Sequence, residues 1–288
     1  MNVARVTLRD LGDSFTDWSQ ESDPDRRVRY WSNAGTGAIS ESFWSRWARP
    51  SAPDDWSGGG SGADLRGWLA NGYELPGVTF QDSDLAALRE RPRWTYSDSD
   101  GDYRYDLDES GIPECYARRA NRPSIPGIRV EVELSVDCDV NGANVREYGA
   151  FVIRSLSALE AAGIDLAVYA RISSQGSFKA NGTSLSRLII TCKREGEAMD
   201  YRYFSPIFSP AGFRVLGFYG LMREADSYNR KIAVGLGRTL GGSSVHKVTY
   251  DPSSQAIVFT PANNRSTALD TNRLTAELLT ALDESRRA

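Results

Sequence analysis

The sequence predicts an α/β fold with a mainly parallel sheet and helices in three layers, and residues 128–170 carry most of that prediction. Apolar and polar side chains alternate over residues 128–136, and apolar side chains recur at helical spacing over residues 143–162. An apolar run over residues 164–170 follows. A strand, a helix and a second strand in this order are typical of a parallel βαβ unit, where ligands usually bind beyond the end of the first strand.

The first strand of this unit has one apolar and one polar side. The apolar side consists of Val130, Val132, Leu134 and Val136, and the polar side consists of Arg129, Glu131, Glu133 and Ser135. A central parallel strand is usually apolar on both faces. The charged side therefore indicates that one face of the sheet is only partly covered.

The connecting helix has a glycine in its middle and another directly after it. Gly163 is a typical residue for ending the helix. Gly149 costs about 1 kcal/mol relative to alanine in a helix interior. We therefore expect the helix backbone to approach the sheet closely at Gly149.

Further elements are expected on both sides of this unit. Short strands are predicted at residues 3–8, 185–191, 245–250 and 256–260, and helices at residues 64–71, 82–90, 210–224 and 267–286. Residues 1–125 are rich in Trp, Arg, Gly and Asp and lack long periodic patterns. We expect them to form an irregular N-terminal region packed on a core of residues 126–288, which ends in an amphipathic helix.

The contents of charge, cysteine and histidine argue against several functional classes. The chain has 288 residues and a net charge of −4, whereas duplex-binding domains are usually strongly basic. Its three cysteines, in no paired spacing, argue against a disulfide framework or a zinc site. The single histidine, His246, lies in an expected strand, which disfavours a histidine-based triad. No signal peptide or membrane span is evident, so we expect a cytoplasmic protein, or one that is packaged from the cytosol.

The loop DCDVNG, after the first strand of the βαβ unit, is the main candidate for chemistry. Asp137, Asp139 and Asn141 occupy alternate positions before a glycine, as in the first half of a calcium-binding loop. Such a loop needs a glutamate at its twelfth position, which is Tyr148 here. A structural alternative is that Asn141 or Asn144 caps the helix and that the acids favour its positive end.

The same loop resembles the metal-binding motif of von Willebrand factor A-type domains, in which a strand ends in D-x-S-x-S and leads into a helix. The corresponding residues are Asp137, Asp139 and Asn141, so both serines are replaced and one carboxylate is added. The resemblance implies a degenerate A-type-like core. The three side chains can still supply oxygen ligands for Mg²⁺ or Ca²⁺, but the resemblance does not by itself imply that a metal binds there.

A second acidic cluster lies in the N-terminal region, where aspartates alternate with tyrosines. Asp98, Asp100 and Asp102 are candidate ligands for a hard cation such as Ca²⁺. The alternative is a solvated acidic turn between two short extended segments, with the tyrosines packed inward.

Arginines and tryptophans form a candidate binding surface near the N-terminus. Its residues are Arg29, Trp31, Trp44, Arg46 and Trp47. Indole rings stack on bases and guanidinium groups neutralise phosphates, so this surface would suit single-stranded nucleic acid. The alternative, which the neighbouring acidic residues favour, is that the tryptophans anchor a loop-rich segment on the core.

The order of several stretches resembles an uncharacterised family with A-type-like α/β cores in phages and other mobile elements. The stretches are DDWSGGGSGADLRGWLANGYELPG, GDYRYDLDESGIPECY, the βαβ unit and FSPAGFRVLGFYGLMREAD, within residues 54–226. The resemblance implies a fold and a viral origin. It carries over no catalytic residue, and the first fifty residues lie outside it.

Together these observations favour a non-enzymatic binding or assembly module of a phage or mobile element, which interacts with a protein partner or with itself. Two other classes stay open. A virion-associated structural protein would use the N-terminal segment and the acidic loop for subunit contacts. A metal-dependent enzyme of phosphodiester chemistry would use Asp137 and Asp139, with residues 98–102, around Mg²⁺.

Overall fold

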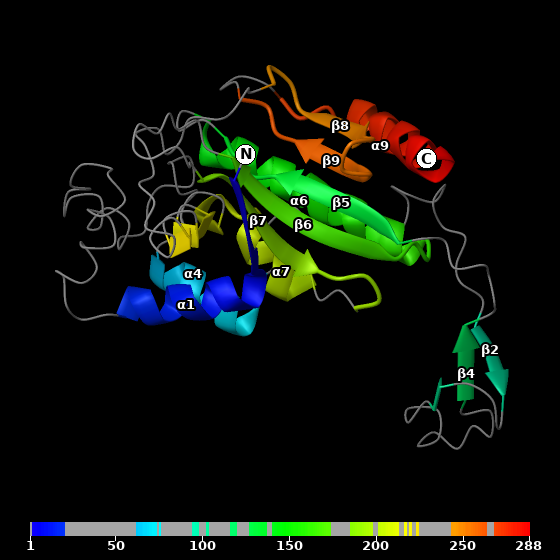
Figure 1. Ribbon diagram of the computed structural model, residues 1–288, viewed down its shortest axis with the longest axis horizontal. Helices are drawn as coiled ribbons and strands as arrows, with labels where there is room; N and C mark the ends of the chain where they lie inside the picture. Colours follow the sequence, from blue (N-terminus) through cyan, green and yellow to red (C-terminus); the bar gives the residue numbers. More distant parts are fainter. Residues whose placement is uncertain are drawn as a thin grey trace.

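A six-stranded mixed sheet forms the centre of the protein, with strand order β1-β7-β6-β5-β9-β8 (Figure 1). The strands are β1 (Asn2–Thr7), β5 (Ile128–Glu133), β6 (Leu166–Ser173), β7 (Leu185–Lys193), β8 (Lys247–Asp251) and β9 (Ala256–Thr260). The computed structural model describes residues 2–20, 62–73, 75, 94–97, 102–103, 116–119, 127–136, 140–173, 185–197, 201–212, 216–217, 219–220, 223–224, 243–263 and 268–288.

The α/β class is confirmed, but the sheet is not parallel throughout. The three central strands, β6, β5 and β9, run parallel to one another. β7 is antiparallel to β6, β8 is antiparallel to β9, and β1 is parallel to β7. β8 and β9 are joined by a turn at residues 252–255, and so short a connection permits only antiparallel pairing. The expectation of a mainly parallel sheet is therefore corrected to a mixed one.

Helices pack on one apolar face of the sheet. The helices are α1 (Leu8–Gln20), α4 (Gly62–Asn71), α6 (Gly142–Ala161), α7 (Tyr201–Phe208) and α9 (Thr271–Arg287). The apolar face is built from buried side chains on β5, β6, β7, β8 and β9: Val130, Val132, Val168, Ala170, Leu188, Ile190, Val248, Ile257 and Phe259. On α6, Phe151 contacts Phe259, with ring centroids 6.2 Å apart.

The opposite face of the sheet is polar and carries no helix within the ranges that the structure describes. On β8, Lys247 and Thr249 are exposed on this face, whereas Val248 between them is buried on the apolar side. α9 therefore packs on the apolar side of β8, and among the described residues no helix forms a third layer on the polar face. The expectation that one face is less covered agrees with the placement of the described helices.

The N-terminal region contains regular elements rather than only irregular chain. β1 pairs with β7 at the edge of the main sheet, and Leu11 and Phe15 of α1 are fully buried in the core. The sheet therefore draws on both sides of residue 125. A separate three-stranded antiparallel sheet, of order β2-β4-β3, consists of β2 (Trp94–Ser97), β3 (Asp102–Tyr103) and β4 (Tyr116–Arg119). The helix predicted at residues 82–90 lies outside the described residues.

One stretch for which the sequence predicts no element forms a helix, and one local expectation differs from the structure. The aromatic stretch at residues 201–208 forms helix α7. Gly149 of α6 makes a close approach, but to α7 and not to the sheet, because a β-carbon there would collide with the carbonyl oxygen of Phe208. Two helix backbones thus pack directly against each other where the sequence has glycine.

Candidate functional site

The carboxyl ends of β5, β6 and β9 meet at one edge of the sheet, which we call the carboxyl edge. From β5 the chain passes through α6 to β6 on one side, while β9 pairs with β5 on the other. This arrangement makes the end of β5 a topological switch point, where open α/β sheets commonly bind ligands. The segment of residues 134–141, which links β5 to α6, therefore lies at the position expected for a site.

Asn141 is the residue of the predicted metal loop that the structure describes. It is the N-cap of α6, and its Oδ1 accepts a hydrogen bond of 2.8 Å from the backbone N–H of Asn144. This is the capping role that the sequence offered as the alternative, and it satisfies one of the free N–H groups of the first turn. Asp137 and Asp139 lie outside the described residues.

The other predicted sites fall largely outside the described ranges as well. Asp98 and Asp100 of the acidic cluster lie outside them, and Asp102 is placed in β3 through its backbone alone. The Arg/Trp surface also lies outside the described residues; it comprises Arg29, Trp31, Trp44, Arg46 and Trp47. Within the described part of the chain, no three His, Cys, Asp or Glu side chains gather as a metal site would require.

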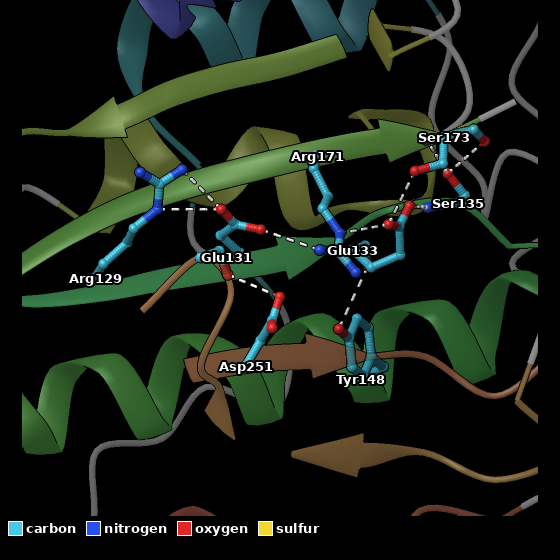
Figure 2. Close-up of polar contacts among 9 residues, drawn as sticks. Arg129, Glu131, Glu133, Ser135, Tyr148, Arg171, Ser173 and Asp251 are labelled. Atoms are coloured by element: carbon cyan, nitrogen blue, oxygen red, sulfur yellow. Dashed lines mark hydrogen bonds and ion pairs between the residues drawn. The ribbon is translucent and has the colours of Figure 1, made fainter. Parts of the chain in front are cut away.

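Four charged side chains form an ion-pair network on the polar face, beside the carboxyl edge (Figure 2). The Nη2 atom of Arg129 lies 2.7 Å from Oε1 of Glu131, and Nη1 of Arg171 lies 3.0 Å from Oε2 of the same carboxylate. Arg171 Nε donates to Oε2 of Glu133 at 2.6 Å. Both carboxylates are buried, so Arg171 joins β5 to β6 through two charge-assisted contacts.

The arginine at the centre of the network keeps its charge. Burial would lower the pKa of Arg171, but the charges and hydrogen bonds of Glu133 and Glu131 raise it above its ordinary value. Arg129 also stacks on the ring of Tyr169, with its guanidinium carbon 4.6 Å from the ring centroid. The four charges sum to zero, which makes the network self-neutralising.

Two serines extend this network to the carboxyl edge. Ser173 Oγ donates to Oε2 of Glu133 at 3.2 Å, and the backbone N–H of Ser135 donates to Oε1 at 3.1 Å. Ser135 Oγ accepts from Ser173 N at 2.6 Å and donates to Ser173 O at 2.8 Å. The ends of β5 and β6 are thus joined by side chains at the point where the loop begins (Figure 2).

Behind the loop, the rings of Tyr148 and His246 stack with centroids 5.4 Å apart and planes inclined by 19°. Burial, reinforced by the charge of Glu133, raises the pKa of Tyr148 well above its ordinary value. The Tyr148 hydroxyl donates a long hydrogen bond of 3.4 Å to the carbonyl oxygen of Glu133. Tyr148, which stands where a calcium loop would need glutamate, is therefore a neutral packing residue.

His246 lies one residue before β8 and is buried. Its Nδ1 accepts a hydrogen bond of 3.1 Å from the backbone N–H of Ala262, which follows β9. Burial and the charge of Arg273 lower the pKa of His246 to about 4. The ring is therefore neutral at pH 7 and joins the start of β8 to the end of β9.

A second buried cation lies at the opposite, amino edge of the sheet. The Nζ atom of Lys193 lies 3.1 Å from both Asp165 Oδ1 and Glu160 Oε1, and it donates to the carbonyl oxygen of Leu166 at 2.6 Å. All three of its ammonium protons have acceptors. This cluster fixes the ends of α6 and β7 to the start of β6, which is a structural role.

Sequence reasoning did not assign a role to Arg171 or Ser173. The alternation along β5 did reveal the polar side on which Glu131 and Glu133 lie. What it could not reveal is the register of β6, which places Arg171 opposite Glu133.

None of the described helices is long and apolar enough to cross a membrane.

Comparison with known proteins gives a family but no described activity. No match is found among the curated proteins or among the solved structures. Residues 2–283 match the model of a family described as Domain of unknown function (DUF7192). Because that match spans both the N-terminal elements and the C-terminal helix, the chain belongs to the DUF7192 family.

Proposed function

We propose that the protein is a non-enzymatic binding or assembly module that presents the β5–α6 loop, at the carboxyl edge, to a protein partner. The observation that carries this proposal is the topological switch point at the end of β5, with α6 and β6 on one side and β9 on the other. A partner that contacts this edge meets residues 134–141 and the segment 261–263 after β9.

The chemistry around the loop supports binding rather than acid–base catalysis. The Glu133 carboxylate is occupied by Arg171, by the N–H of Ser135 and by the hydroxyl of Ser173. Tyr148 and His246 are neutral at pH 7 and packed against each other. These groups fix residues 134–136 at the base of the loop, so less conformational entropy is lost when a partner binds there.

A degenerate von Willebrand factor A-like core and an origin in a phage or mobile element are part of the same proposal. Both rest on the sequence resemblance. The strand–loop–helix order that the A-type motif requires is compatible with β5, the loop and α6, with Asn141 at the start of the helix. In such a core Asp137, Asp139 and Asn141 would hold Mg²⁺ and the metal would take part in partner binding.

Site-specific photo-cross-linking tests the proposal. A p-benzoylphenylalanine replaces Asp139 in the loop, and the control replaces Arg194, which is exposed at the amino edge. In host cells, we expect position 139 to form one discrete adduct that the purified partner reproduces, and position 194 to form none. Equal adducts at both positions would contradict the proposal, as would magnesium-dependent hydrolysis of a model phosphodiester that is lost in D137N.

A further inference from the structure

One buried polar atom on the polar face lacks a hydrogen bond. Among the described side chains, Nε of Arg187 is the only buried nitrogen or oxygen without a partner. A buried donor left unpaired keeps the full cost of its desolvation, so native proteins rarely have one without a reason. Arg129 and Arg171, on the same face, each contact a carboxylate.

A second unpaired guanidinium lies on the neighbouring strand. Arg187 is in register with Val3 of β1, and Arg5 lies two positions further along β1, opposite Ile189. Residues two apart share a face, and Ile189 is buried between the two arginines on the polar side. From a strand spacing of about 4.8 Å and a rise of about 3.3 Å per residue, the two arginine backbones lie about 8 Å apart.

No described acidic side chain neutralises the charges of Arg5 and Arg187. The ion-pair network next to them sums to zero, since Arg129 and Arg171 balance Glu131 and Glu133. Within the described ranges, neither Arg5 nor Arg187 forms an ion pair or hydrogen bond through its side chain. The end of the polar face near β1 and β7 therefore carries two positive charges without a described partner.

We propose that Arg5 and Arg187 form a binding site for a phosphate dianion, either free or as the monoester of a small ligand. A phosphate monoester carries a charge of about −1.5 to −2 at pH 7, which matches two guanidinium groups. A single carboxylate would leave one of them unneutralised. Each guanidinium presents a planar fork that donates to two phosphate oxygens, and one of these oxygens would be the acceptor that Nε of Arg187 lacks.

This site lies on the polar face next to the base of the β5–α6 loop, and a phosphate site there goes beyond the proposed function. Arg187 is opposite Ser173 across the β6–β7 pair, so the phosphate would lie beside the serines that join β5 to β6. Binding there would bridge β1 and β7.

Calorimetric titration of the full chain with inorganic phosphate, at constant ionic strength, tests the site. The variants are Arg187→Gln and Arg5→Gln. The matched control is Lys247→Gln, which removes an exposed positive charge from the same face at the opposite edge. We expect each arginine variant to weaken phosphate binding at least about tenfold, because each removes a bidentate charge-assisted contact. The control should stay within about twofold.

Three further probes separate the sources of the ligand. Methyl phosphate that binds as tightly as inorganic phosphate would assign the site to a phosphorylated ligand, and binding of inorganic phosphate alone would assign it to the free ion. Absence of phosphate binding at millimolar concentration would overturn the proposal. Equal binding of acetate, tighter binding of a single-stranded oligonucleotide, or equal losses in all three variants would also overturn it.

Circular dichroism checks that each variant is folded. If Arg187→Gln does not fold, Arg187→Lys keeps the charge and removes the fork, and it should still weaken phosphate binding. Unchanged binding in Arg187→Lys together with unchanged binding in Arg5→Gln would reject the assignment.

Discussion

Replacing Arg171 by methionine should destabilise the protein strongly, because Arg171 is the only cation that contacts Glu133 among the described residues. Its side chain is 16% exposed, and the side chain of Glu133 is 11% exposed. Breaking a buried ion pair by removing one partner costs roughly 3–5 kcal/mol. Glu133 keeps hydrogen bonds from Ser135 N and Ser173 Oγ, each with a net contribution of about 1 kcal/mol. We therefore expect a loss near the lower limit, about 3 kcal/mol.

Arg129→Met is the matched control within the same network. Arg129 is 32% exposed, and Glu131 keeps its contact with Arg171 when Arg129 is removed. Exposed ion pairs contribute about 0–1 kcal/mol, so the control should cost about 1 kcal/mol or less. The free energy of unfolding is measured by urea denaturation, followed by far-ultraviolet circular dichroism at pH 7.

A double-mutant cycle with Glu133→Gln decides whether the pair itself is responsible. In the double variant no buried carboxylate is left without a cation, so it should lose less stability than the sum of the single variants, by about 1–3 kcal/mol. A loss in the double variant that equals the sum of the two single losses to within about 0.5 kcal/mol would show that the ion pair is not responsible. The reasoning also fails if Arg129→Met costs as much as Arg171→Met.

Three other substitutions test neighbouring parts of the structure. Gly149→Ala should lower the free energy of unfolding, measured in urea, by about 1–3 kcal/mol, because the new β-carbon meets the Phe208 carbonyl. Gly67→Ala in α4 places its β-carbon in open space and should raise the free energy of unfolding by up to about 1 kcal/mol. Equal effects of the two substitutions would refute the close approach. Asn141→Ala should lower the free energy of unfolding by about 1 kcal/mol, because it removes the cap of α6, whereas Asn141→Asp should keep the cap and the stability of the wild type. Equal stability of Asn141→Ala and the wild type would refute the capping role. Because the pKa of His246 is lowered to about 4, its contribution to the free energy of unfolding is full above about pH 6.5 and is lost as the pH falls toward 4. The stability of His246→Gln should therefore fall less than that of the wild type over this pH range. Parallel pH profiles of the two proteins would contradict this expectation.

The parts of the fold that could be predicted are those with local periodicity. Strand β9, at residues 256–260, has the predicted bounds, and α6 differs from the predicted helix by one residue at each end. Alternation along β5 also gave the polar side that carries the ion-pair network. Each of these patterns is contained in a few consecutive residues, so it can be recognised without the rest of the chain.

The parts that could not be predicted depend on distant residues. β1, at residues 2–7, pairs with β7, at residues 185–191, which lies far away in the sequence. Nothing within residues 2–7 indicates that partner. The stretch at residues 201–208 is too short for its period to distinguish a helix from a strand, and Pro206 inside it argues against a helix. The metal loop, the acidic cluster and the Arg/Trp surface stay predictions, except that Asn141 caps α6.

The most direct test of the central claim, that the carboxyl edge is the binding face, is hydrogen exchange measured by mass spectrometry with and without the partner captured at position 139. We expect slower exchange over residues 134–145 and 261–263, and no change at the amino edge, over residues 194–197 and 252–255. Protection of the amino edge without protection of the β5–α6 segment would contradict this claim.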